Sequence, residues 1–141
     1  MLIVIRGYKF DEQTIRILRT RHGEGGYRYK LSKQDKVYFK VRIYCSIIYY
    51  LFKDIKDNIK NEEIFLNVCK DFQGHEKDIT SNLLYMLKDL LGLKINKIYH
   101  LKLTKESDAD KYAYLMRKDK KNLIKGYVNI GLDEIEIFLK K

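Results

Sequence analysis

One stripe of apolar residues recurs at three- and four-residue spacing through the first half of the chain, and it constrains the fold more than any other feature. Its members are Val37, Val41, Cys45, Ile48, Phe52, Ile55 and Ile59. This spacing predicts a helix over residues 35–59 with one buried face. Apolar residues at positions 47 and 49–51 widen the stripe. We therefore expect the middle of the helix to be covered on more than one side.

The segment after this helix alternates between strand and helix patterns. Residues 63–69 are predicted to form a mostly buried strand, and residues 95–103, whose side chains alternate, are predicted to form another strand. Between them, a helix is predicted over residues 75–91, and its buried positions are Ile79, Leu83, Met86, Leu87, Leu90 and Leu91. Gly92 stands where a left-handed helix cap is expected, with Leu93 as its hydrophobic contact. Another helix is predicted over residues 107–121.

The N-terminal third is expected to form three strands. Residues 2–8 are apolar and β-rich, and residues 27–32 alternate between apolar and polar side chains. Residues 14–21 fit a short helix or a strand, and the neighbouring alternating segment favours a strand joined to it by the Gly-rich turn at 23–26. In that hairpin Arg28 and Lys30 face solvent. The tail over 127–138 fits one or two edge strands or a short helix.

Composition sets the broad class of the protein. The 141 residues are 45% hydrophobic and 34% charged, which excludes intrinsic disorder. There is no proline and no Gly/Ser-rich linker, so we expect a single domain over 1–141. The sequence contains no membrane-spanning run and no signal-peptide pattern, so we expect a cytoplasmic protein without a membrane partner. Cys45 and Cys69 are expected in the core rather than in a disulfide framework.

Positive charge is concentrated near the N-terminus. The net charge is +10, and residues 1–42 contain eleven Lys or Arg against four Asp or Glu. Six of the seven arginines lie in this segment. Because the guanidinium fork matches phosphate oxygens, the cluster predicts contact with DNA or RNA. The candidate contacts are Arg16, Arg19, Arg21, Arg28 and Lys30. A basic surface that reflects overall composition alone is the alternative.

The expected order β-β-β-α-β-α-β-α resembles the ribonuclease H-like superfamily of nucleases, integrases and resolvases. Two segments contribute to the resemblance: Val68–Phe72, which places Asp71 just past a strand, and Ser107–Ala113, which places Asp108 and Asp110 at the start of a helix. The resemblance implies a mixed α/β fold, with helices packed on a mixed sheet. It also implies that Asp71, Asp108 and Asp110 are catalytic and bind Mg²⁺ or Mn²⁺ for phosphodiester hydrolysis. Where the family has a further carboxylate in its first strand, this chain has Val4 and Ile5.

Each acidic candidate also has a structural interpretation. Asp108 and Asp110 fit the first turn of a helix that Ser107 caps, and Asp71 fits turn chemistry before Gly74. A small metal cluster of Asp71, His75 and Asp78 is a weaker alternative to strand-end and cap roles. His22 is expected in a solvated loop, and His100 is expected to be a packed or surface residue of a strand.

Three functions therefore stay open at this point. The first is a nucleic-acid-associated protein of ribonuclease H-like fold, either a divergent active nuclease or an inactive one. The second is a non-catalytic module that binds DNA or RNA through the Arg-rich hairpin. The third is a protein-interaction or structural protein with no nucleic-acid role. The sequence does not decide whether the protein is an enzyme.

Overall fold

The computed structural model describes residues 7–9, 12–102 and 127–140, and it mixes helices with parallel strands. The mixed α/β class expected from the sequence is therefore confirmed. In chain order the elements are β1 (Gly7–Lys9), α1 (Glu12–Gly23), α2 (Lys33–Ile59), β2 (Glu63–Cys69), α3 (Glu76–Leu83), the π-helix η1 (Leu84–Leu90), β3 (Lys94–Leu101), β4 (Tyr127–Asn129) and α5 (Leu132–Glu136).

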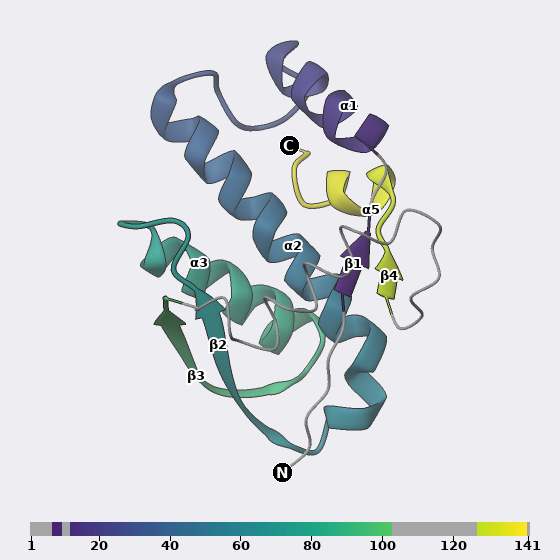
Figure 1. The fold of residues 1–141 in the computed structure, drawn as a ribbon, viewed down its shortest axis with the longest axis vertical. Helices are drawn as coiled ribbons and strands as arrows, with labels where there is room; N and C mark the ends of the chain where they lie inside the picture. The colour runs from purple at the N-terminus through teal and green to yellow at the C-terminus, as the bar shows by residue number, and fades with distance from the viewer. Residues whose placement is uncertain (1–6, 10–11, 103–126, 141) are drawn as a thin grey trace.

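Helix α2 organises the fold because it contacts most of the other elements. It packs against α3, η1, α5, β1 and β4, and Figure 1 shows it running through the middle of the molecule. Its first turn is capped by Ser32, whose hydroxyl accepts a hydrogen bond from the Asp35 backbone N–H at 3.2 Å. The predicted helix over 35–59 is confirmed. Burial of Val41, Ile47 and Tyr50 covers α2 on more than one side, as the widened stripe predicted.

The strands form two parallel pairs. β1 pairs with β4, and β2 pairs with β3 after a crossover through α3 and η1. In the second pair Ile64 lies opposite Ile95, and a register shift then places Phe65 opposite Lys97. The strands predicted over 63–69 and 95–103 are confirmed, with β3 ending at Leu101.

The helix predicted over 75–91 is present, but its second half is a π-helix. Because π-helical bonding adds a residue to each turn, side chains after Leu87 rotate away from their α-helical positions. Leu87 is buried, whereas Leu90, which the α-helical pattern places in the core, is 45% exposed. The expected cap is confirmed: Gly92 has φ +70°, and the Leu93 N–H donates to the Leu87 carbonyl at 3.0 Å.

The predicted hairpin of residues 14–21 and 27–32 is wrong. Residues 12–23 form helix α1, in which Thr14, Leu18 and His22 recur at four-residue spacing and are all buried. The loop after it bonds to other parts of the chain: the Arg28 N–H donates to the Leu139 carbonyl, and the Lys30 N–H donates to Asp35. The described residues therefore do not form the three-stranded N-terminal meander, and the ribonuclease H-like arrangement stays a prediction.

Other expectations fall partly or wholly beyond the described residues. β1 overlaps the end of the strand predicted over 2–8, and residues 1–6 lie outside the description. The helix predicted over 107–121 also lies outside it. The tail, which the sequence left open, forms the short strand β4 followed by the short helix α5. None of the helices in the described ranges is long and apolar enough to cross a membrane.

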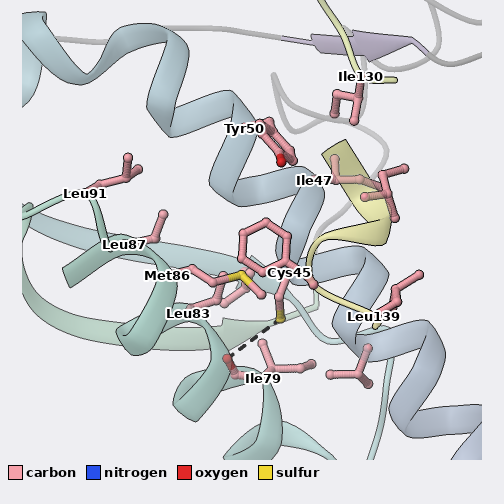
Figure 2. Packing of buried hydrophobic residues seen from close by; sticks show 14 of the residues in the cluster. Cys45, Ile47, Tyr50, Ile79, Leu83, Met86, Leu87, Leu91, Ile130 and Leu139 are labelled. Carbon is pink, nitrogen blue, oxygen red and sulfur yellow. Dashed lines mark hydrogen bonds between the residues drawn. The ribbon is translucent and has the colours of Figure 1, made fainter. Parts of the chain in front are cut away.

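The core lies between α2, the α3–η1 helix and the C-terminal segment. Figure 2 shows Cys45 of α2 beside Leu83 and Met86, Ile47 of α2 toward α5, and Leu139 on the C-terminal segment. Leu83, Met86, Leu87 and Leu139 have no exposed surface. The Cys45 thiol lies 3.9 Å from the Ile79 carbonyl, and burial raises its pKa from 9.0 to about 12. Cys45 is therefore a core thiol at neutral pH, as its place in the apolar stripe predicted.

Candidate functional site

Two of the predicted nucleic-acid contacts lie together on the solvent face of α1. Arg16 and Arg19 lie one helical turn apart. Both are exposed, because Thr14, Leu18 and His22 occupy the buried face of the helix. Within the described part of the chain, no carboxylate pairs with either guanidinium. Two guanidinium groups so placed are available to phosphate oxygens from solvent.

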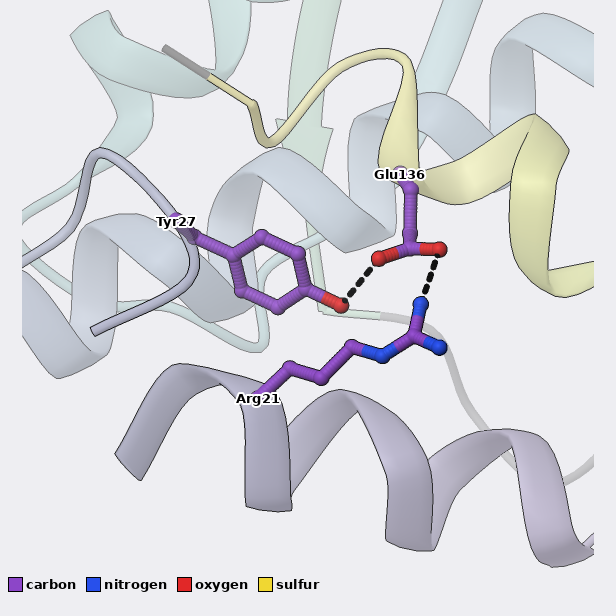
Figure 3. Close-up of polar contacts among 3 residues, drawn as sticks. All are labelled: Arg21, Tyr27 and Glu136. Carbon is purple, nitrogen blue, oxygen red and sulfur yellow. Dashed lines mark hydrogen bonds and ion pairs between the residues drawn. The ribbon is translucent and has the colours of Figure 1, made fainter. Parts of the chain in front are cut away.

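The Arg21 side chain points toward α5 and stabilises the fold through an ion pair. Its Nη1 lies 2.5 Å from Oε1 of Glu136, and the Tyr27 hydroxyl donates to the other carboxylate oxygen at 2.9 Å. Figure 3 shows this arrangement, which joins α1, the following loop and α5. Burial acts to raise the pKa of Glu136, but the bonds from Arg21 and Tyr27 outweigh it and lower the pKa. Arg21, unlike Arg16 and Arg19, therefore has a carboxylate partner within the fold.

Arg28 and Lys30 lie on the loop that replaces the expected hairpin. Arg28 donates to the Tyr29 hydroxyl at 2.9 Å, and its guanidinium lies 5.1 Å from that ring's centroid. Arg28 also lines a pocket of about 420 Å³, whose other lining residues are Tyr29, Asp35, Tyr38, Asp78 and Asn82. Two carboxylates beside one guanidinium disfavour a phosphate group in this pocket.

Arg42, although part of the N-terminal cluster, is also committed to the fold. Its Nε donates to the Phe138 carbonyl at 3.0 Å, and its Nη1 donates to the side chain of Asn82. Burial, followed by the nearby charge of Arg28, lowers the pKa of this guanidinium. The arginine cluster thus divides by role: Arg21 and Arg42 stabilise the fold, while Arg16 and Arg19 face solvent.

Asp71 lies just past the carboxyl end of β2, as the sequence predicted. It is exposed, and the Cys69 thiol donates to its Oδ1 at 3.1 Å. The Lys70 N–H donates to the Leu101 carbonyl at 2.8 Å, so the carboxyl ends of β2 and β3 lie side by side. Asp108 and Asp110, the other two carboxylates of the expected site, lie outside the described residues.

The described residues do not by themselves fit the metal site that the resemblance implies. In residues 12–102 and 127–140, no three His, Cys, Asp or Glu side chains converge. His75 packs edge-on against Tyr38, with the ring centroids 5.7 Å apart, and Asp78 accepts a bond from Asn82 at 3.2 Å. The alternative cluster of Asp71, His75 and Asp78 is therefore not formed, and a single carboxylate at the end of β2 does not make a site for paired metal ions.

Of the histidines His22 and His100, only His22 differs from its expected environment. His22, expected in a solvated loop, is buried and stacks on Phe39 with ring centroids 4.2 Å apart. Its Nε2 lies 3.0 Å from the Lys30 carbonyl, so it packs the loop against α2. His100 is a packed strand residue, as expected, with Nε2 2.8 Å from the Thr80 hydroxyl.

The sequence interpretation missed one exposed aromatic surface. Phe65 and Tyr99 lie on the outer face of the β2–β3 pair, although residues 63–69 were expected to be mostly buried. Glu63 and Asn67 flank Phe65 at two-residue spacing. Because alternate strand residues share a face, these polar neighbours were a signal that Phe65 faces solvent.

Comparisons with known proteins leave the chain without an assigned relative. No protein-family model, curated protein or solved structure shows a significant match to it.

Proposed function

We propose that this chain is a nucleic-acid-associated protein that contacts phosphates through helix α1. The observation that carries the proposal is the exposed pair Arg16 and Arg19, which has no acidic partner in the described part of the chain. The net positive charge of the N-terminal segment supports the same conclusion, because it attracts a polyanion over a long range. Residues 1–42 contain eleven Lys or Arg and four Asp or Glu. Guanidinium groups one turn apart suit adjacent phosphates of a backbone.

The catalytic form of the proposal is a nuclease that resembles the ribonuclease H-like superfamily. It is supported by the position of Asp71, because ligands of α/β proteins bind beyond the carboxyl ends of parallel strands. Asp108 follows Leu101 by seven residues, a stretch that reaches at most about 25 Å. The carboxylates of Asp71, Asp108 and Asp110 would bind Mg²⁺ or Mn²⁺, the ions that hard oxygen ligands prefer. The non-catalytic form of the proposal, a module that only binds nucleic acid, requires Arg16 and Arg19 but none of these carboxylates.

We expect the salt dependence of binding to report the two arginines directly. Each phosphate contact adds about 0.9 to the slope of log affinity against log salt for duplex DNA, and about 0.7 for a single strand. Replacing Arg16 and Arg19 together by Ala should therefore reduce this slope by about 1.4 to 1.8. Fluorescence anisotropy with a labelled oligonucleotide across a salt series measures it.

A matched control removes the same charge elsewhere. Lys77→Ala combined with Lys88→Ala takes two exposed cations from α3 and η1, and it should leave the slope close to that of the wild type. Equal slopes for the arginine double variant and the wild type would exclude α1 as the contact. A wild-type chain that binds no polyanion at low salt would refute the proposal and favour the protein-interaction role.

The catalytic form predicts cleavage that depends on both a divalent ion and Asp71. With Mn²⁺ present, Asp71→Asn should reduce the rate of phosphodiester cleavage by at least about a hundredfold, since even outer-shell changes at metal sites reach that size. EDTA should abolish the wild-type reaction. Asp89→Asn, which changes an exposed carboxylate on η1, is the matched control. Cleavage that survives both EDTA and Asp71→Asn would contradict a metal site at this strand end.

A further inference from the structure

The outer face of the β2–β3 pair exposes large apolar side chains in a regular pattern. Phe65 is 56% exposed, Tyr99 38% and Leu101 44%. The opposite face is the packed one: Val68 and Ile95 are buried, and His100 bonds to Thr80 of α3. Parallel strands are normally covered on both faces, and none of the described residues covers this one, so the exposed aromatic face is a feature that a partner would cover.

The strand register places the two rings as diagonal neighbours. Phe65 lies opposite Lys97, and Asn67 lies opposite Tyr99. The Phe65 and Tyr99 rings are therefore on neighbouring strands and are offset by two residues along the strand direction. Ordinary strand geometry makes that separation about 8 Å. Successive bases of an extended single strand can occupy two flat side chains at this spacing, one base on each ring.

Lys97 shares this face with the two rings, and further lysines lie at the ends of the two strands. The Lys97 ammonium lies 5.1 Å from the centroid of the Tyr99 ring, and Lys70, Lys94 and Lys102 are exposed at the ends of the two strands. Cations beside exposed aromatic rings are the combination that binds single-stranded nucleic acid, because the rings stack on bases while the cations hold the backbone. A hydrophobic partner protein would not need these charges.

The geometry points to a binding platform for single-stranded DNA or RNA on this face, with bases stacked on Phe65 and Tyr99. This inference rests on the proposed nucleic-acid function and adds the form of the substrate. A duplex keeps its bases stacked inside the helix, whereas a single strand can spread them onto aromatic side chains. The platform therefore selects single strands over duplexes.

The platform also leads toward Asp71. Phe65, Asn67 and Cys69 share one face of β2 by alternation, and the Cys69 thiol bonds to Asp71 at 3.1 Å. A strand whose bases lie on Phe65 and Tyr99, if it continues along β2 past Cys69, comes to the Asp71 carboxylate beyond the end of the strand. The phosphodiester backbone of the bound strand would then pass beside the exposed Asp71 carboxylate.

The test compares a labelled oligothymidylate with a duplex of the same length. Phe65→Ala and Tyr99→Ala should each weaken binding of the single strand by about fivefold to one-hundredfold, which is the contribution of one stacked base. Duplex binding should change by less than about twofold. Tyr85→Ala removes an exposed aromatic residue from η1 instead of the sheet, and it should leave single-strand binding unchanged.

A second variant gives a readout that a merely structural role would not produce. The chain has no tryptophan, so Phe65→Trp supplies a unique fluorophore at the platform. Its emission should be quenched by the oligothymidylate while affinity is kept or improved.

The outcomes separate the platform from the proposed function. If the wild type binds but Phe65→Ala and Tyr99→Ala bind equally well, or if Phe65→Trp is not quenched, the platform is refuted and the nucleic-acid function stands. If the wild type binds neither probe, the proposed function itself fails. A dimer that Phe65→Ala converts to a monomer in analytical ultracentrifugation would make this face an interface between copies and overturn the platform.

Discussion

Leu87→Ala is expected to lower the free energy of unfolding by about 3 kcal/mol, whereas Leu90→Ala should lower it by less than about 1 kcal/mol. Leu87 has no exposed surface, so its truncation leaves a cavity in the core. Leu90 is 45% exposed, and its truncation removes atoms already in water. For a chain of 141 residues, the first change should also lower the melting temperature by about 10 °C.

The comparison tests the π-helix as well as the core. An α-helix that continued through residues 84–90 would place Leu87 and Leu90 on one buried face, so the two variants would be similarly destabilised. In the π-helix, Leu90 is rotated out of the core. Urea unfolding followed by circular dichroism measures both variants. A loss near 3 kcal/mol for each would contradict η1.

Periodicity was sufficient to predict the elements whose burial is regular. The stripe from Val37 to Ile59 identified α2, because a long helix in contact with many elements buries residues at nearly every turn. Gly92 marked the end of the helix before β3, since the left-handed cap needs a residue without a side chain. These signals are local, so one sequence contains them in full.

Helix α1 could not be predicted in the same way because its burial depends on distant residues. Three arginines and one histidine interrupt the apolar pattern of residues 12–23, and the neighbouring alternating segment suggested a hairpin. The structure resolves this conflict through tertiary contacts: His22 stacks on Phe39, and Arg21 pairs with Glu136, 115 residues away. Propensity in a short segment is weaker than such contacts.

The candidate site was predictable only in part for a similar reason. Charge composition identified the arginines, but only the fold separates Arg16 and Arg19, which face solvent, from Arg21 and Arg42, which bond to the C-terminal segment. Asp71 was correctly placed after a strand because strand ends can be located from pattern. The outer-face pair Phe65 and Tyr99 depends on the register of two strands, which the sequence does not specify by itself.

Stability is expected to fall steeply in alkaline solution, beginning near pH 9. Burial raises the pKa of Cys45 from 9.0 to about 12, and burial also raises the pKa of Tyr27, Tyr44 and Tyr50. These groups keep their protons in the folded state but lose them in the unfolded chain near their ordinary values. Their stabilising effect is therefore complete below those values and is lost as the pH rises toward the folded pKa.

Of these four groups, Cys45 is the first to lose its proton in the unfolded chain as the pH rises. Between pH 9 and its folded pKa of about 12, the thiol alone should reduce stability by about 1.4 kcal/mol per pH unit. The tyrosines begin to contribute near pH 10, where the unfolded chain loses their protons. Urea unfolding in reducing buffer at several pH values measures the slope.

Cys45→Ala separates the thiol from the tyrosines. The variant should be less stable than the wild type at neutral pH because a buried group is lost, yet its stability should change little from pH 9 to 10. Above pH 10 only the tyrosines should lower its stability, so its slope should stay about 1.4 kcal/mol per pH unit shallower than that of the wild type up to the folded pKa of Cys45. The tyrosine effect itself is kept, since Tyr50 still donates to the Glu134 carbonyl at 2.5 Å and Tyr27 still donates to Glu136. Equal slopes for the two proteins from pH 9 to 10 would show that the Cys45 thiol reaches water in the folded state, which the packing of α2 against α3 does not allow.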